Sequence, residues 1–149
     1  MWRKLVLFVV AGFWAVFLFA GHSQAQSQEL NFITSVPPHA FIVEQLVGDE
    51  VEIVSLVDQG SDPHTYEPTP KQMLAISQAS LLFAGGLEFE RALLAKISSL
   101  NRNLVVVDLS SPQASDHTHS DQHPWLSPTL FGQQVDAVFG ALCQYLPDQ

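Results

Sequence analysis

Short apolar segments alternate along the chain with longer segments of mixed polarity. Three short runs rich in β-branched residues predict strands at residues 30–36, 51–57 and 104–107, and the short apolar run 81–84 predicts a buried strand. Apolar residues at helical spacing predict helices that begin near residues 37, 70, 89 and 129. This alternation predicts an α/β fold, a four-stranded parallel sheet with helices on both faces.

The helical spacing also predicts which side chains face the core. For the first two helices they are Ala40, Phe41, Val43, Leu46 and Val47, then Met73, Leu74 and Ile76. For the last two they are Leu93, Leu94 and Ile97, then Leu130, Val135, Val138, Phe139 and Leu142.

Residues 1–25 have the pattern of a secretory signal peptide. Arg3 and Lys4 precede an apolar run over residues 5–20, and the small residues Ser23 and Ala25 predict cleavage after Ala25. The alternative is an uncleaved membrane anchor, but the run is short for a span of about 20 residues. We therefore expect an exported, periplasmic protein.

Charge and cysteine content restrict the partners. The chain has 6 Lys and Arg against 15 Asp and Glu, a net charge of −9, and removing Arg3 and Lys4 with the signal peptide makes it −11. Such a chain favours cations over nucleic acid. The single cysteine, Cys143, forms no internal disulfide and no paired thiolate site, so a metal would need imidazole and carboxylate ligands.

The segment 60–70 carries His64 and is rich in Pro, Gly and Asp, which predicts neither helix nor strand. It leaves the second predicted strand and enters a helix, and ligands of α/β folds bind at such carboxyl ends of strands. We interpret His64 as a candidate metal ligand. By itself the residue would more simply be an exposed histidine with no partner.

A second constrained loop, residues 123–128, carries His123 after the fourth predicted strand. It should emerge at the same edge of the sheet as His64, and two imidazoles there would make half of a zinc site. The alternative is a histidine that only precedes a helix and packs on Trp125.

Three further histidines are weaker candidates. His117 and His119 alternate with polar residues in the loop 110–122, which predicts either an auxiliary metal-gathering segment or a solvated linker. His39 follows Pro37 and Pro38, and we expect it to be exposed in the first turn of a helix rather than to face the site.

Enzyme signatures are sparse. The sequence has no Gly-x-Ser-x-Gly, no glycine-rich phosphate loop and no His-Glu-x-x-His. Glu88 and Glu90 would point apart on a helix. For a zinc-dependent hydrolase, Glu67 is the one candidate general base. Because enzyme signatures are otherwise sparse, we expect the protein not to be an enzyme.

Several motifs together resemble the periplasmic metal-binding proteins of zinc and manganese ABC importers. They are Ser35-Val36-Pro37-Pro38, Asp62-Pro63-His64-Thr65-Tyr66-Glu67-Pro68-Thr69-Pro70, Gly86-Leu87-Glu88-Phe89-Glu90 and His123-Pro124-Trp125-Leu126-Ser127-Pro128. The second motif of the family usually reads Asp-Pro-His, whereas this chain has Asp121-Gln122-His123. The resemblance implies that His64 and His123 are the metal ligands of the N-terminal lobe, with the remaining ligands on a second lobe.

The resemblance also implies an organisation. Residues 1–25 would be the signal peptide, residues 26–128 the N-terminal metal-binding lobe and residues 129–149 the start of an inter-lobe linker helix. The chain would then be a fragment or a truncated gene product of a two-lobed protein. The His-rich loop resembles the zinc branch, so Zn²⁺ is expected before Mn²⁺, with the permease of an ABC importer as partner and a monomer as the state.

Three functions remain open from the sequence. The first is metal capture for an ABC importer. The second is a periplasmic zinc store or adhesion-type surface protein built on His117 and His119. The third is the zinc-dependent hydrolase.

Overall fold

A computed structural model of the chain describes residues 30–48, 51–110 and 123–146. The strands are β1 (Asn31–Thr34), β2 (Glu52–Ser55), β3 (Leu81–Ala84) and β4 (Val105–Asp108). The α-helices are α2 (Pro37–Val47), α3 (Pro70–Gln78), α4 (Glu88–Leu100) and α5 (Pro128–Tyr145), and two short 3-10 helices are η2 (Pro63–Thr65) and η4 (Pro124–Leu126). The predicted signal peptide and the segment with His117 and His119 lie outside the described residues.

The four strands form one parallel sheet in the order β2-β1-β3-β4. The predicted fold class is therefore confirmed, although β1 and β2 are shorter than the runs 30–36 and 51–57 that predicted them. No helix of the described ranges is both long and apolar enough to cross a lipid bilayer.

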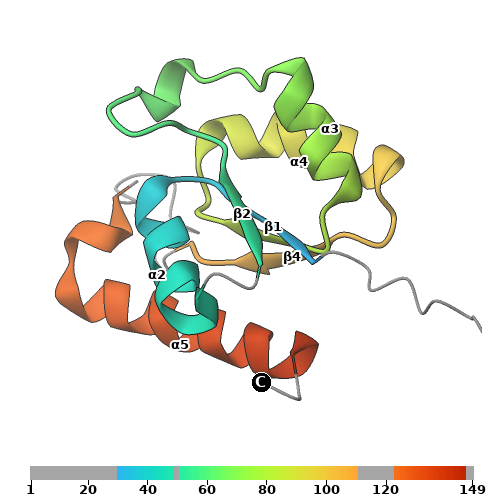
Figure 1. Ribbon diagram of the computed structural model, residues 1–149. Helices are drawn as coiled ribbons and strands as arrows, with labels where there is room; N and C mark the ends of the chain where they lie inside the picture. The colour runs from blue at the N-terminus through green and yellow to red at the C-terminus, as the bar shows by residue number, and fades with distance from the viewer. Residues whose placement is uncertain (1–29, 49–50, 111–122, 147–149) are drawn as a thin grey trace, which may run out of the picture.

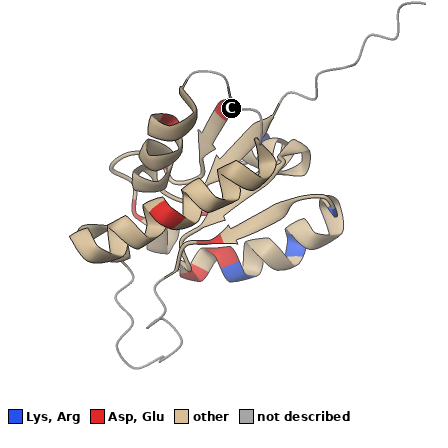
Figure 2. Ribbon diagram, turned by 90° about the horizontal axis from the view of Figure 1, so that it is seen from below, with Lys and Arg blue, Asp and Glu red and all other residues tan. Residues whose placement is uncertain are grey.

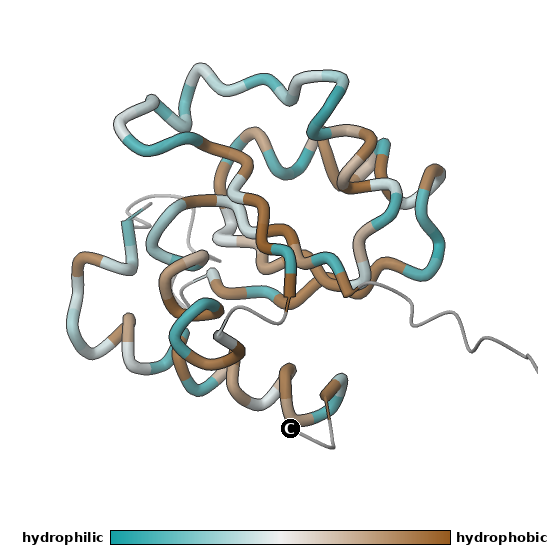
Figure 3. The backbone as a smooth tube through the Cα atoms, viewed as in Figure 1, coloured by the Kyte–Doolittle hydropathy of each residue, from teal (hydrophilic) through white to brown (hydrophobic). Residues whose placement is uncertain are grey.

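Helices cover both faces of the sheet (Figure 1). On one face α2 and α5 pack over a core that includes Phe32, Val43 and Val138. On the other face α3 and α4 pack over Ile33 and Ile76 with their neighbours. The hydropathy colours of Figure 3 follow this arrangement, because the central strands are apolar and the segment between β2 and α3 is largely hydrophilic.

Four of the side chains expected in the core are exposed instead. Phe41 and Leu46 on α2, Leu74 on α3 and Phe139 on α5 are all at least 40% exposed. Each helix contacts the sheet along a narrower stripe than its apolar residues occupy. On α2 the predicted Val43 is buried together with Ile42, which was not predicted, and Phe41 and Leu46 lie outside the core. Helical spacing identified the helices correctly but gave too wide a buried face.

The strand order creates a switch point in the middle of the sheet. The central strands β1 and β3 are neighbours, but β1 continues into α2 on one face and β3 continues into α4 on the other. Ligand sites of open α/β sheets form outside the carboxyl ends of the strands at such a point. The fold therefore provides a position for a site between the ends of β1 and β3.

Helix α3 offers a matched pair of substitutions that tests the buried stripe. Ile76 is fully buried and Leu74, two residues before it, is 59% exposed. We expect Ile76→Ala to lower the free energy of unfolding by about 2–5 kcal/mol, because it leaves a cavity, and Leu74→Ala to change it by less than about 1 kcal/mol. Urea denaturation followed by circular dichroism measures both, and equal effects would contradict the packing described.

Candidate metal centre

The loop with His64 contains a short helix that its composition did not predict. Pro63–Thr65 form the 3-10 helix η2, and the Asp62 side chain caps it by accepting a hydrogen bond from the His64 backbone N–H at 2.9 Å. Proline at the first position suits this turn because it needs no N–H there. The cap and the proline fix the backbone of His64, whose side chain is exposed.

His123 lies at the start of the second 3-10 helix, η4. Its carbonyl accepts a hydrogen bond from the Leu126 N–H at 3.0 Å, and its ring is half-buried. Ser127 then begins α5, where its side chain accepts a hydrogen bond from the Leu130 N–H. Both candidate ligands are thus held at a proline-started turn that leads into a helix.

The structure brings the two imidazoles together. The ring centroids of His64 and His123 are 6.2 Å apart at an interplanar angle of 72°. Two imidazoles on one tetrahedral zinc ion, with Zn–N distances near 2 Å, have centroids about 5 Å apart. A small side-chain rotation would therefore let both rings reach one divalent ion.

The pair has no third ligand in the part of the chain that the structure describes. No group of three or more His, Cys, Asp or Glu side chains there could hold a metal ion. His117 and His119, the auxiliary candidates, are outside that part. Two imidazoles would fill half of a tetrahedral coordination sphere and leave the other positions for further ligands.

Trp125 packs against the rings of both His123 and His39. Trp125 contacts His123 edge-on with centroids 5.3 Å apart, and it contacts His39 edge-on at 5.7 Å. Trp125 therefore lies between a candidate ligand and the first turn of α2. The packing of His123 on Trp125, considered as an alternative to a metal role, is present together with the close approach to His64.

His39 is fully buried, so the expectation that it is exposed was wrong. Its ring lies between Trp125 and Gly85, the residue that follows β3. Both ring nitrogens of His39 are buried without a hydrogen-bond partner. Burial lowers the pKa of His39 to about 4, which keeps the ring neutral at ordinary pH.

The turn after β3 is held by Glu90, a residue to which the sequence gave no role. The Glu90 carboxylate accepts hydrogen bonds from the backbone N–H groups of Gly85, Gly86 and Leu87 at 2.8, 2.7 and 3.0 Å. Burial raises the pKa of Glu90, and hydrogen bonds from Ser35 and from this turn oppose the rise. The signal in the sequence was the glycine pair followed by an acidic residue at the third helical position.

Gly85 lets the turn after β3 approach the His39 ring closely. A Cβ atom at Gly85 would lie 2.7 Å from Cε1 of His39, closer than side chains tolerate. The turn after β3 therefore packs directly against the His39 ring in the first turn of α2. His39 and Glu90 position the floor of the site and do not join His64 and His123 in it.

Comparison with known proteins finds metal-binding and metal-uptake proteins. The family model described as "Zinc-uptake complex component A periplasmic" matches residues 33–149. A putative metal-binding protein of Chlamydia muridarum is 30% identical over 148 residues, which cover 97% of this chain and 52% of the relative. The manganese ABC transporter substrate-binding lipoprotein PsaA of Streptococcus pneumoniae is 36% identical over 81 residues, 54% of this chain and 26% of PsaA.

Solved structures share the fold. The crystal structure of a ZnuA deletion mutant with zinc bound superposes with a TM-score of 0.69 at 34% identity. The match covers 80% of this chain and 48% of that one. The chain thus spans about half the length of the ZnuA and chlamydial proteins that it matches.

The buried His39 predicts an acid-sensitive fold. Its pKa is 6.5 when unfolded and about 4 when folded, so stability is complete above pH 6.5 and is lost as the pH falls towards 4. Between pH 7 and pH 5 this one residue should cost about 2 kcal/mol of unfolding free energy.

The variant His39→Leu should remove that loss and should be about as stable as wild type at pH 7, because it deletes two unpartnered polar atoms. Urea denaturation of both proteins at pH 7 and pH 5 provides the comparison. If His39→Leu loses as much stability as wild type over this range, the acid sensitivity arises elsewhere.

Proposed function

Because the chain belongs to the family of periplasmic zinc-uptake components, we propose that it captures a divalent metal ion, zinc before manganese, for delivery to an ABC importer. The observation that carries this proposal is the approach of His64 and His123, whose rings are 6.2 Å apart although their loops leave the two outermost strands. Family membership alone would not require this chain to have kept both imidazoles.

The choice of zinc is supported by the chemistry of the two ligands. Imidazole nitrogen suits zinc, whereas manganese favours carboxylate, carbonyl and water oxygen. The similar ZnuA structure contains zinc, and the similar PsaA is described as a manganese protein. Relatives of both kinds thus exist, so the preference for zinc rests on the imidazole pair.

The proposed organisation follows that of the family. Residues 1–25 would direct export to the periplasm, residues 26–128 would form the N-terminal lobe, and residues 129–149 would begin the helix towards a second lobe. The ion would bind between the two lobes, through His64, His123 and ligands of the second lobe. The partner would be the membrane permease of the importer, and the protein would act as a monomer and not as an enzyme.

The first test is a calorimetric zinc titration with matched variants. Wild type should bind one zinc ion per chain at this site, and the double variant His64→Ala/His123→Ala should lose that event. The matched control His117→Ala/His119→Ala should keep it, because these residues are proposed only to raise the local supply of metal. Circular dichroism confirms that each variant is folded.

The opposite result would support the zinc store. If the titration of His64→Ala/His123→Ala equals that of wild type and His117→Ala/His119→Ala loses the bound metal, the ion is held by the His-rich loop. Binding should also weaken in acid, since only neutral imidazole coordinates the ion.

The signal-peptide pattern of residues 1–25 leads to a separate prediction. Expressed with its full sequence in a Gram-negative host, the protein should appear in the periplasmic fraction with an intact mass that corresponds to a chain beginning at Gln26. A full-length mass in the membrane fraction would instead support an uncleaved anchor.

A further inference from the structure

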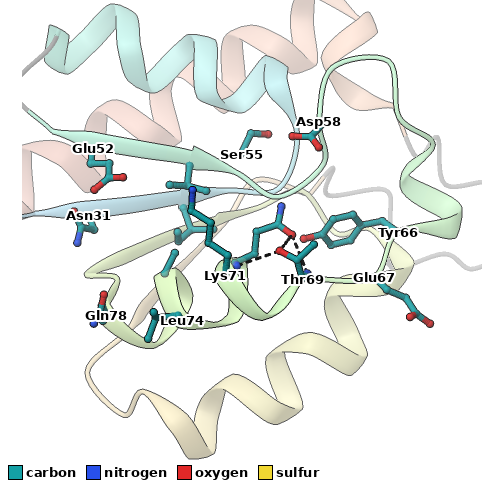
Figure 4. Close-up of a pocket in the computed structure, with 14 residues that line it drawn as sticks. Asn31, Glu52, Ser55, Asp58, Tyr66, Glu67, Thr69, Lys71, Leu74 and Gln78 are labelled. Carbon is teal, nitrogen blue, oxygen red and sulfur yellow. Dashed lines mark hydrogen bonds between the residues drawn. The ribbon is translucent and has the colours of Figure 1, made fainter.

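A groove separate from the two histidines lies on one face of the sheet, beside the outer strand β2. It has a volume of about 600 Å³ and lies between β2 and α3 (Figure 4). Ile33 and Val54 form its apolar floor, and Leu74 and Ala75 of α3 form its wall. This volume is within the usual range of ligand pockets, about 300–1,000 Å³.

The groove exists because α3 does not cover β2. The helix carries the chain from β2 back to β3 and packs against the intervening strand β1. Val54 therefore stays half-buried at the margin of the core, and Leu74 is 59% exposed above it. Apolar side chains of the sheet and of α3 line the groove, and the Lys71 side chain extends from α3 towards β2 (Figure 4).

The strand beside the groove, β2, is an outer strand of the described sheet. Among the described strands, β2 pairs with β1 alone. The Leu56 N–H bonds to the Thr34 carbonyl, so the alternation of a parallel strand directs the main-chain groups of Val54 to β1 and those of Ile53 and Ser55 outward. These outward groups can accept an additional strand.

The charges around the groove favour a basic occupant. Its lining has three acidic side chains, Glu52, Asp58 and Glu67, and one basic side chain, Lys71. Figure 4 shows Glu52 at one end and Glu67 at the other, so carboxylates lie at both ends. All three acidic residues are exposed, and the chain as a whole has a net charge of −9.

We propose that this groove binds an extended, basic segment of another protein, which adds to the outer edge of β2 and places alternate side chains against α3. Strand addition combines main-chain hydrogen bonds with side-chain pockets beside an edge strand, and a groove between an edge strand and a helix provides both. Four residues of β2 extend over about 13 Å, so two outward residues supply the main-chain contacts. The site is independent of the proposed metal function.

The probe is a fluorescein-labelled peptide of alternating lysine and valine, seven residues long, followed by fluorescence anisotropy. It should bind wild type saturably with a Kd below about 1 mM. A peptide of alternating glutamate and valine should not bind. The lysine–valine peptide with an N-methyl group on every backbone amide should bind much more weakly, because it cannot donate main-chain hydrogen bonds from either edge.

Charge-introducing variants locate the site. Leu74→Lys and Glu52→Lys should each weaken binding about fivefold or more, by repulsion of the basic peptide. The matched controls are Leu100→Lys, at a residue 58% exposed on α4, and Glu44→Lys, at an exposed residue of α2. Both controls should stay within about twofold of wild type, and zinc titrations should be unchanged in all four variants.

Each other outcome overturns the proposal. If the lysine–valine peptide does not bind the wild-type protein, the proposal is wrong. Equal losses in the groove variants and the controls would mean attraction to the overall negative charge. Equal binding of the N-methylated peptide would exclude strand addition. If sedimentation shows a wild-type dimer that Leu74→Lys abolishes, and the peptide does not bind, a second copy of the chain is the occupant instead.

Discussion

The arrangement depends on the contact between the carboxyl ends of β1 and β3, where the chain turns towards opposite faces of the sheet. The loops with His64 and His123 follow β2 and β4, which lie at opposite margins. They can meet only above the central pair of strands, so the ends of that pair must be compact. Gly85, directly after β3, allows this close approach, because a Cβ atom there would collide with His39 in the first turn of α2. Neither Gly85 nor His39 is a candidate ligand, yet both shape the sheet ends between the two loops.

Buried polarity is concentrated below the candidate site. His39 has two buried nitrogens without partners, and Glu90 is a buried carboxylate bonded to three backbone N–H groups. Such groups oppose folding unless something compensates for their burial. Glu90 is compensated by the turn after β3. His39 is not, and its contribution is the ring surface on which Trp125 packs. The burial of the His39 ring against Trp125 therefore lowers the stability of the fold in acid.

Hydrophobic periodicity and turn residues were enough to predict the sheet, its helices and the loops that carry His64 and His123, because these follow from local spacing. The depth of a side chain does not follow from local spacing. Phe41 and His39 are both near the start of α2, yet the aromatic residue is exposed and the imidazole is buried. Which of them enters the core depends on how α2 is placed by β1 and Trp125, elements distant in sequence. The candidate metal role of His64 and His123 was predicted from their loops at one edge of the sheet and from the motif resemblance, and the structure adds the proximity of the two rings.

The position of Trp125 has an optical consequence. The other two tryptophans, Trp2 and Trp14, belong to residues 1–25, so a chain without that segment has Trp125 as its single indole. This indole contacts the ring of His123. Its emission would then report on one point of the molecule, the surroundings of a single imidazole, without an added label. An ion that reorients His123 would change the intensity or wavelength of that emission, so occupancy could be followed in real time by stopped-flow mixing.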